Sequence, residues 1–360
     1  MRVIISGGGT GGHIFPAIAI ANALKNINPE IEILFVGAKG KMEMEKVPAA
    51  GYKIIGLTVA GLQRKLTARN LLFPFKLIAG MMQAKRVVKE FNPDVAVGVG
   101  GYASGPVLRV ASNAGVPCLL QEQNSYPGIT NKILAKKSKR ICVAYPGMER
   151  FFPSEKIVMT GNPVRQDIMT KVERSEAVKH FGLDSSKKTI LVVGGSLGAR
   201  SVNDGILSGI KGLEEDVQLL WQTGKFYFEE MKSGAGDVKS VKIQPFIKRM
   251  DMAYTIADVV ISRAGALSVS ELAVAGKPVI FIPSPNVAED HQTKNAKVMV
   301  DDDAAIMVKD NDKNILIEKA QELLKDKEMM DKLSKNILKH ARPDAAEKIA
   351  REVLEVKSEK

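Results

Sequence analysis

Apolar residues along this chain fall into two alternating kinds of segment. Short, continuous apolar runs, which predict buried strands, are followed by glycine-rich turns and then by longer segments with helical periodicity. The predicted strands are residues 2–6, 31–36, 94–99, 116–121, 189–193 and 258–261. Because helices alternate with strands and the turns follow the strands' carboxyl ends, we predict an α/β fold of doubly wound parallel sheets with a ligand at those ends.

The pattern restarts in the second half of the chain. After a break at Gly161-Asn162-Pro163, a strand, the glycine loop Gly194–Gly198 and a helix follow one another, as a strand, the loop Gly7–Gly12 and a helix do at the start. A length of 360 residues also favours two domains. We therefore predict two Rossmann-like domains that face each other across a cleft. The first comprises residues 1–162 with a returning C-terminal helix in 341–360, and the second comprises residues 163–340.

One strand–turn–helix segment, residues 258–276, carries a predicted nucleotide site. The strand breaks at Gly265, and a helical pattern then continues to Gly276, a predicted C-cap. The backbone N–H groups of Gly265–Ser268 would lie at a helix start, which favours a bound phosphate. Glu271, about one helical turn further on, can accept two hydrogen bonds from a ribose diol. The alternative interpretation is an ordinary strand–turn–helix with a solvated glutamate.

The first glycine loop permits another interpretation. Gly7, Gly9 and Gly12 satisfy the G-x-G-x-x-G pattern of dinucleotide oxidoreductases. Such enzymes hold the ribose with an acidic residue near the end of the second strand, but here that strand ends in Gly37-Ala38-Lys39. The motif therefore indicates only a backbone that approaches an anion or a sugar, and a dehydrogenase is disfavoured.

Charge is distributed unevenly along the chain. Residues 1–165 hold 22 Lys and Arg against 9 Asp and Glu, whereas residues 166–360 hold 30 against 31. The basic excess of the first half predicts an anionic partner on that domain, such as lipid headgroups or a phosphorylated substrate. Nucleic acid is disfavoured, because the sequence contains neither interleaved aromatic residues nor a known binding module.

The remaining composition predicts a cytosolic setting. Cys118 and Cys142 both lie in apolar, strand-like runs, so we expect no disulfide and a reducing compartment. The chain opens directly with a strand, from which we expect no signal peptide. It also has no apolar run long enough to cross a bilayer. We expect a soluble protein, or one that sits on a membrane surface.

Residues 74–91 are a candidate for that membrane contact. A core-facing helical stripe would comprise Leu77, Met81, Ala84, Val88 and Phe91. A second apolar stripe, Phe75, Ile78 and Met82, is bordered by the basic residues Lys85, Arg86 and Lys89. Apolar patches edged by cations fit an anionic membrane surface. Internal packing or a dimer contact would also explain this pattern.

Eight segments, taken together, resemble the motifs of a known family. They are GGTGGH (Gly8–His13), GGYASGP (Gly100–Pro106), EQN (Glu122–Asn124), GNPVR (Gly161–Arg165), GGSLGAR (Gly194–Arg200), FI (Phe246–Ile247), GALSVSE (Gly265–Glu271) and DHQ (Asp290–Gln292). In this order they are similar to the MurG family of bacterial peptidoglycan glycosyltransferases, which has the two-lobed GT-B fold. Two positions depart from the family pattern. Family members often carry Gln where Leu197 stands, so this side chain cannot help to bind the donor. They often carry His where Gln121 stands, so this residue can neither titrate nor act as a base.

The resemblance implies an inverting transfer of N-acetylglucosamine (GlcNAc) from UDP-GlcNAc to the 4-hydroxyl of a lipid-linked muramyl pentapeptide, which converts lipid I to lipid II. It implies a first domain that faces the acceptor and the membrane and a second that binds the donor. Together with the basic first half, it places the protein peripherally on the anionic inner leaflet, at the cytoplasmic face of the cell membrane.

The resemblance also implies roles for individual residues. In the first domain, Thr10, Gly11 and Gly12 form the loop near the donor sugar and phosphates, and Asn124 contacts the donor together with Arg165. In the second domain, Ser196 meets the diphosphate, Ile247 offers its backbone to uracil, and Gln292 holds the GlcNAc hydroxyls. Ala266, Leu267, Ser268, Val269 and Ser270 supply phosphate-binding amides, and Glu271 holds the ribose.

For the catalytic base, His13 is the first candidate of the four histidines, since it follows the glycine loop. His13 could instead only cap or orient that loop, and Glu122 is the reserve. His291 is expected to position Gln292, whereas His180 and His340 are expected at the surface.

We expect neither a metal nor a cofactor. Asp301-Asp302-Asp303 contains a D-x-D pattern but reads as a surface turn, and no His/Cys cluster has ligand spacing. The amides of Gly265–Ser268, with Ser196 and Arg165, can instead stabilise the negative charge that develops on the departing UDP.

Two functions of other classes remain open from the sequence. A UDP-sugar epimerase of the same two-lobed class would keep the nucleotide site but need acid and base carboxylates in the cleft. A non-catalytic UDP-sugar-binding protein would bind the donor without turnover. The basic, apolar first half favours a lipid-linked acceptor over both.

Overall fold

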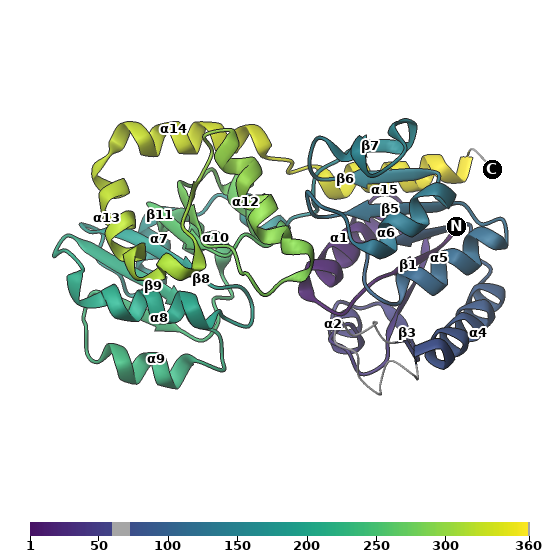
Figure 1. Ribbon diagram of the computed structural model, residues 1–360, viewed down its shortest axis with the longest axis horizontal. Coiled ribbons are helices and arrows are strands. Elements are labelled where there is room, and N and C mark those ends of the chain that lie inside the picture. The colour runs from purple at the N-terminus through teal and green to yellow at the C-terminus, as the bar shows by residue number, and fades with distance from the viewer. Residues whose placement is uncertain (60–72, 359–360) are drawn as a thin grey trace. The chain divides into compact units, whose positions relative to one another are not determined.

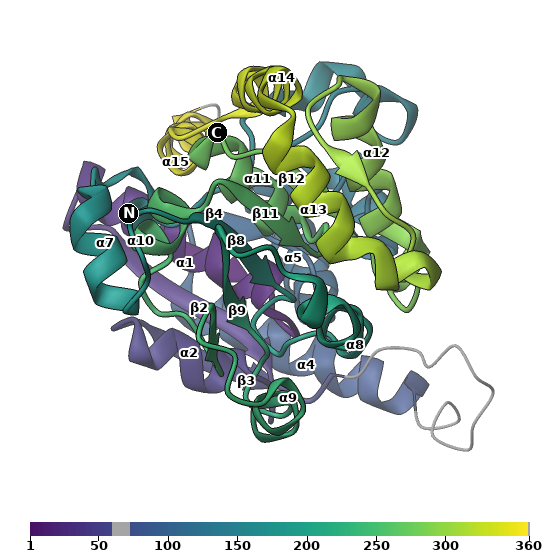
Figure 2. The same cartoon turned by 90° about the vertical axis from the view of Figure 1, so that its left-hand side faces the viewer.

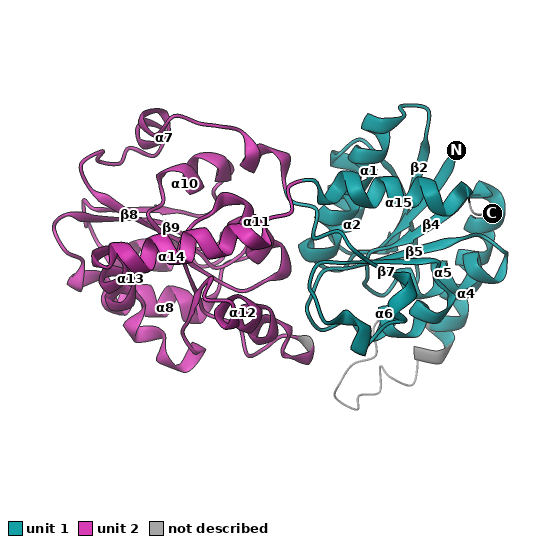
Figure 3. Ribbon diagram, turned by 90° about the horizontal axis from the view of Figure 1, so that it is seen from above, with its two compact units in different colours: residues 1–164, 344–360 teal, residues 165–343 magenta. Residues whose placement is uncertain are grey.

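The computed structural model describes residues 1–59 and 73–358, and the chain divides into two compact units. Unit 1 comprises residues 1–164 and 344–360, and unit 2 comprises residues 165–343 (Figure 3). The first boundary thus lies two residues beyond the predicted one, and the returning segment starts at Asp344. Both chain termini belong to unit 1 (Figure 1).

Within the described residues, unit 1 forms a seven-stranded parallel sheet in the order β3-β2-β1-β4-β5-β6-β7. Its strands are β1 (Arg2–Ser6), β2 (Glu32–Ala38), β3 (Lys53–Leu57), β4 (Val95–Gly98), β5 (Cys118–Glu122), β6 (Arg140–Val143) and β7 (Ile157–Met159). The central strands are buried on both faces, which explains their continuous apolar runs. Cys118 and Cys142 are both buried and unbridged.

Helices cover both faces of this sheet. They are α1 (Gly11–Ile27), α2 (Glu43–Ala49), α4 (Phe73–Phe91), α5 (Ser104–Asn113), α6 (Ile129–Leu134) and α15 (Ala345–Ser358), with the short helices η1 (Ala135–Lys137), η2 (Met148–Arg150) and η3 (Ser154–Lys156). On one face α1 and α15 pack together, so the last helix does return to the first domain. On the other face α4 and α5 bury their apolar stripes.

Unit 2 repeats the design. Its described strands form a six-stranded parallel sheet in the order β10-β9-β8-β11-β12-β13. They are β8 (Lys188–Val193), β9 (Val217–Gln222), β10 (Val241–Gln244), β11 (Val259–Ser262), β12 (Val279–Phe281) and β13 (Ile306–Met307). Two doubly wound parallel sheets confirm the predicted fold class.

The helices of unit 2 also lie on both faces of its sheet. They are α7 (Arg174–Phe181), α8 (Arg200–Gly209), α9 (Phe228–Ala235), α10 (Met250–Ile256), α11 (Ala266–Ala275), α12 (His291–Asp301), α13 (Leu316–Lys325) and α14 (Lys327–Ile337), with η4 (Gln166–Met169), η5 (Ile210–Gly212), η6 (Ala288–Asp290), η7 (Asp310–Ile315) and η8 (Leu338–His340). Figure 2 shows α8 and α13 on one side of β8 and β11, with α7 and α10 on the other.

Helix α4 carries the predicted surface stripe. Phe75, Ile78 and Met82 are 70%, 58% and 66% exposed, as expected for residues that the core does not need. The predicted core stripe is wrong at one position, because Leu77 is also exposed, and the buried face begins only at Gly80 and Ala84. None of the helices in the described part of the chain is long and apolar enough to span a membrane.

Candidate active site

In each unit the strand order reverses beside the first strand, and this switch point holds the predicted loops. In unit 2 it lies between β8 and β11. The loop Gly194–Gly198 follows β8, and the turn 263–265 follows β11, so both lie at the carboxyl ends of adjacent strands. In open α/β sheets this is where ligands bind.

Helix α11 begins where the sequence predicted a phosphate site. Gly265 is its N-cap residue in an extended conformation, and Gly276 ends it with a left-handed φ of 64°. Among the described residues no side chain caps the N-terminus of α11. Its first-turn N–H groups, which belong to Ala266, Leu267 and Ser268, therefore lie at a helix start suited to an anion.

Glu271 lies one turn into α11, next to Tyr254 of α10. The Tyr254 hydroxyl donates to Glu271 Oε2 over 3.4 Å. Burial raises the pKa of the Glu271 carboxyl to about 7, against the opposing influence of the Arg165 guanidinium. This carboxyl group is thus a hydrogen-bond acceptor whose charge changes near neutral pH.

Arg165 lies beside the same carboxyl group. Its guanidinium pairs with Asp167, and Nη2 also donates to the backbone carbonyl of Lys248 at 3.1 Å. Since Lys248 follows Ile247, the structure brings together three of the residues that the sequence nominated: Arg165, Ile247 and Glu271.

The side chain of Gln222, which sequence reasoning missed, links two predicted parts of the donor site. This residue ends β9 and is buried. Its Nε2 donates to the Gly195 carbonyl at 3.0 Å, and its Oε1 accepts the Ile247 N–H at 2.7 Å. The N–H of Ile247 is therefore engaged within the protein, which leaves its carbonyl as the group that the backbone offers to a base.

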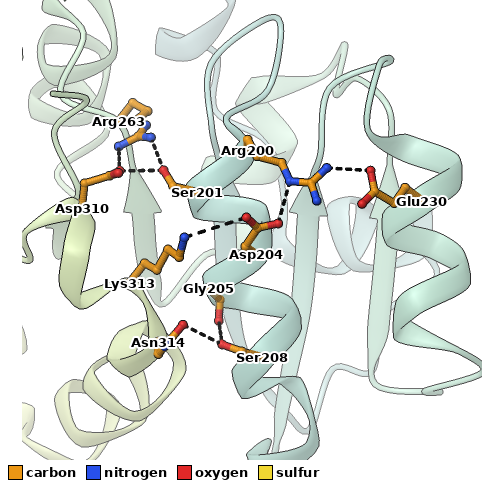
Figure 4. Close-up of polar contacts among 10 residues, drawn as sticks. All are labelled: Arg200, Ser201, Asp204, Gly205, Ser208, Glu230, Arg263, Asp310, Lys313 and Asn314. Atoms are coloured by element: carbon orange, nitrogen blue, oxygen red, sulfur yellow. Dashed lines mark hydrogen bonds and ion pairs between the residues drawn. The ribbon is translucent and has the colours of Figure 1, made fainter. Parts of the chain in front are cut away.

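An ion pair between buried Arg263 and half-buried Asp310 ties the two loops of unit 2 together (Figure 4). Arg263, directly after β11, bonds Asp310 Oδ1 and the hydroxyl of Ser201, in each case over 2.6 Å. Ser201 lies at the start of α8, just after the glycine loop, and its hydroxyl donates to Asp310. Three side chains thereby hold the start of α8 against the turn before α11.

The outer surface of α8 carries more exposed ion pairs. Arg200 contacts Asp204 at 2.9 Å and Glu230 at 2.8 Å, and Lys313 lies 3.8 Å from Asp204 (Figure 4). Exposed pairs of this kind contribute little to stability. The Arg263–Asp310 pair is less exposed and is expected to contribute more.

The other two residues predicted for the donor site, Ser196 and Gln292, also belong to unit 2. Ser196 is exposed in the glycine loop. Gln292, in the first turn of α12, accepts the Ser284 N–H at its Oε1 over 2.9 Å. Its carboxamide NH2 is therefore the end that could donate to a sugar hydroxyl.

In unit 1 the switch point lies between β1 and β4, and the loop Gly7–Gly12 follows β1. The side chain of Glu43, which is 1% exposed, fills the space beside this loop. Its Oε2 accepts the Gly9 N–H and its Oε1 accepts the Ala38 N–H, each at 2.9 Å. A Cβ on Gly8 would lie 2.2 Å from Glu43, so glycine is required there. Nothing in the sequence indicated this role for Glu43 beyond its position shortly after β2.

His13 is half-buried in the first turn of α1. Its Nδ1 lies 3.0 Å from Oε1 of Gln123, a buried residue just after β5. A Cβ on Gly100 would come within 2.9 Å of the imidazole ring, so the bare Gly100 backbone makes room for it. The structure thus joins the GGTGGH, GGYASGP and EQN segments around one histidine.

Glu122, the second candidate for the catalytic base, is 2% exposed and bonds the loop that follows β5. Its Oε1 accepts the backbone N–H of Asn124, and its Oε2 accepts the side-chain amide of Asn131 at 2.8 Å and the Gly128 N–H. Burial raises the pKa of this carboxyl group, against these hydrogen bonds. With both oxygens engaged, Glu122 holds Asn124 in place and is poorly disposed to accept a substrate proton.

The other predictions on titratable residues have mixed outcomes. His180 is exposed, as expected, but His340 is half-buried and lies 3.1 Å from Asp302, and burial lowers the pKa of its imidazole. Asp301 is the exposed last residue of α12, and Asp302-Asp303 form the exposed turn that follows it. Within residues 1–59 and 73–358, no cluster of three or more His, Cys, Asp or Glu side chains could hold a metal ion.

Two doubly wound sheets, each with a glycine loop at its switch point, define the GT-B architecture. The chain matches the glycosyltransferase family 28 N-terminal domain over residues 3–143 and the family 28 C-terminal domain over residues 189–349. It therefore belongs to glycosyltransferase family 28, and the resemblance to the MurG family drawn from its motifs is confirmed.

Individual relatives cover nearly the whole chain. A Cytophaga hutchinsonii protein named UDP-N-acetylglucosamine--N-acetylmuramyl-(pentapeptide) pyrophosphoryl-undecaprenol N-acetylglucosamine transferase is 57% identical over 358 residues, 99% of this chain and 96% of the relative. The crystal structure of Acinetobacter baumannii MurG has 29% identity and a TM-score of 0.79, covering 98% and 99% of the two chains. The fold alone is shared with UDP-GlcNAc 2-epimerase from Neisseria meningitidis bound to UDP-GlcNAc, at 16% identity, a TM-score of 0.70 and coverage of 99% and 100%.

Proposed function

We propose that this chain is an inverting glycosyltransferase that moves GlcNAc from UDP-GlcNAc to the 4-hydroxyl of N-acetylmuramyl-(pentapeptide)-pyrophosphoryl-undecaprenol, converting lipid I to lipid II in peptidoglycan synthesis. The observation that carries the proposal is the relative of 57% identity, whose name states this transfer and which the chain matches almost end to end. The loops of unit 2 support it, because their chemistry suits a nucleoside diphosphate.

Unit 2 is the proposed donor-binding domain. The first-turn amides of α11 would receive the diphosphate together with Ser196. The Ile247 carbonyl would accept from uracil, Glu271 would accept from the ribose diol, and the Gln292 amide would donate to the sugar. As UDP departs, negative charge grows on its phosphate, and preorganised donors aimed at such charge are typically worth about 3–4 kcal/mol each.

Unit 1 is the proposed acceptor-binding domain, with His13 as base. The 4-hydroxyl oxygen would attack the anomeric carbon of GlcNAc while the bond from that carbon to the UDP oxygen breaks. The hydroxyl proton would pass to the His13 imidazole, and UDP would leave with the bonding electron pair. Attack opposite to the leaving group inverts the anomeric configuration and yields a β linkage. Thr10, Gly11, Gly12 and Asn124 are the proposed supporting residues.

We further propose that α4 docks unit 1 on the anionic inner leaflet of the membrane, which would make the protein peripheral at the cytoplasmic face. Exposed Phe75, Ile78 and Met82 would enter the interface. Met82 shares a surface hollow with Lys85, Arg86, Lys89 and Glu90, where Glu90 pairs with Arg86 at 2.7 Å. Each of the two remaining cations, Lys85 and Lys89, would be worth about 1 kcal/mol near an anionic leaflet.

Liposome co-sedimentation tests this docking. Replacing Phe75, Ile78 and Met82 by Ser should abolish binding to anionic vesicles. The control replaces Phe226 and Leu338, exposed apolar residues of unit 2, by Ser and should leave binding intact. Equal binding of the α4 variant and the unmodified protein would remove the proposal.

Radiolabelled transfer tests the catalytic function. UDP-GlcNAc and the lipid-linked muramyl pentapeptide should give labelled disaccharide lipid, and UDP-galactose should give none. Production of UDP-N-acetylmannosamine or free N-acetylmannosamine without acceptor would favour an epimerase instead. Tight donor binding with no turnover in the presence of acceptor would favour a binding protein.

A further inference from the structure

The orientation of the Gln123 carboxamide follows from its neighbours. Its Nε2 donates to the Val99 backbone carbonyl at 2.8 Å and to the Gln121 side-chain carbonyl. Because a backbone carbonyl cannot donate, the atom that faces Val99 must be the NH2 group. Gln123 Oε1 therefore points the other way, to within 3.0 Å of His13 Nδ1.

Two further amides continue the hydrogen-bonded chain behind Gln123, whose orientation the Val99 carbonyl already fixes. Gln121 Nε2 donates to Asn162 Oδ1 at 3.0 Å, and Asn162 Nδ2 donates to the Gln123 backbone carbonyl at 2.9 Å. All three side chains are at most 1% exposed. Flipping any one of them would set oxygen against oxygen or NH2 against NH2, and buried polar groups left without partners are costly.

The tautomer of His13 follows from that orientation. An amide oxygen only accepts, so the imidazole nitrogen that faces it must carry the hydrogen. In a neutral imidazole the other nitrogen then holds the lone pair. The ring cannot easily turn away, because it packs against the bare backbone of Gly100.

We infer that Gln123 is a positioning residue that holds His13 in the Nδ1–H tautomer, so that Nε2 is the atom that takes the proton from the acceptor hydroxyl. The proton-acceptor role rests on the proposed function, whereas the tautomer does not. In the transfer step the proton moves to Nε2, Nδ1 keeps its hydrogen, and the resulting imidazolium still donates to Gln123 Oε1.

Nitrogen-15 NMR of the full-length protein with labelled histidine tests the tautomer directly. His13 signals are assigned by their loss in His13→Asn. We expect a pyrrole-type shift for Nδ1 and a pyridine-type shift for Nε2 at neutral to mildly alkaline pH. A pyridine-type Nδ1 in the unmodified protein would overturn the inference whatever the activity.

Gln123→Met and Gln121→Met separate positioning from general damage. Gln123→Met removes the acceptor, so the Nε2–H tautomer should appear and kcat should fall about 10- to 100-fold, within the range of a disturbed general base. The KM for UDP-GlcNAc should change less than about twofold, since the donor contacts are unaltered. Gln121→Met changes another side chain of the same buried hydrogen-bonded chain but leaves the Gln123 amide bonded to the Val99 carbonyl. This variant should therefore keep the Nδ1–H tautomer and most of kcat.

The outcomes test separately whether Gln123 sets the His13 tautomer and whether His13 is the base. A retained Nδ1–H tautomer in folded Gln123→Met would refute the role of Gln123. If Gln123→Met does not fold, a pyridine-type Nδ1 in Gln121→Met or in the unmodified protein would still refute it. Turnover in His13→Asn within tenfold of the unmodified protein would remove His13 as base while leaving the tautomer assignment standing.

Discussion

The glycine loops of the two units look alike in sequence but hold different partners. In unit 1 the Gly9 N–H is bonded to the buried carboxylate of Glu43, whereas in unit 2 the Gly195 carbonyl is bonded to the neutral amide of Gln222. Two unit charges 4 Å apart repel by about 4 kcal/mol at the effective dielectric near a protein surface. That exceeds the roughly 1 kcal/mol gained from a typical hydrogen bond.

The difference teaches that a glycine loop does not by itself specify a phosphate site. The Gly9 N–H that Glu43 occupies is not available to a phosphate, whereas the Gln222 amide brings no negative charge to the loop of unit 2. This difference in charge favours unit 2 as the site of the UDP diphosphate in our proposal. The variants below would break or sharpen this contrast.

The largest effect is expected from Arg263→Ala in unit 2. Removing one partner of a fully buried ion pair costs about 3–5 kcal/mol. Because Asp310 is half-buried and still accepts from Ser201, we expect a loss near the lower end of that range. Denaturation followed by the fluorescence of Trp221, the single tryptophan, reports on unit 2. Arg200→Ala, which removes only exposed pairs, should cost less than about 1 kcal/mol. Equal losses in the two variants would contradict the bracing role of Arg263.

Glu43→Gln should destabilise unit 1 by about 1–3 kcal/mol, because an amide cannot accept from both Gly9 and Ala38. Hydrogen exchange over residues 1–38 measures this loss. Glu45→Gln, on the exposed side of the same helix, should stay within about 0.5 kcal/mol. UDP affinity should be unchanged in both. A change of more than about fivefold (roughly 1 kcal/mol) in Glu43→Gln would place the nucleotide in unit 1.

UDP affinity should fall with acidity because of Glu271. Its pKa lies near 7 in the unliganded protein, and only the ionised carboxylate accepts from both ribose hydroxyls. Binding therefore releases a proton, and affinity should be about tenfold weaker at pH 6 than at pH 8. Isothermal titration calorimetry measures this dependence. Glu271→Gln should bind more weakly and keep only the dependence due to the phosphates, and an identical pH profile in both proteins would refute the role.

The smallest effect is expected from Gln222→Met, which removes the link between Gly195 and Ile247. UDP affinity should fall about three- to tenfold, or about 1 kcal/mol. Gln218→Met is the matched control, since Gln218 is buried at the other end of β9 and bonds Asp184 and Thr189. This control should lose stability but keep its UDP affinity. The same affinity loss in both would mean that Gln222 acts only through stability.

The sequence by itself determined the local elements and the chemistry that they present. Continuous apolar runs predicted β1 at its observed bounds, and Gly276 marked the end of α11, because strand burial and a left-handed C-cap are encoded by neighbouring residues. Motif order was sufficient for the family. Helical periodicity was less reliable at the start of α4, where Leu77 is exposed.

Only the tertiary structure decided which side chains complete each site. Glu43 reaches Gly9 across 34 positions, Gln222 reaches Gly195 across 27, and Gln123 reaches His13 across 110. Periodicity records which face of an element is buried, but it carries no information on which distant polar group satisfies a buried N–H or carbonyl. Those pairings arise when parallel strands bring their carboxyl ends to one edge, and there the choice of acid or amide sets the charge and the tautomer.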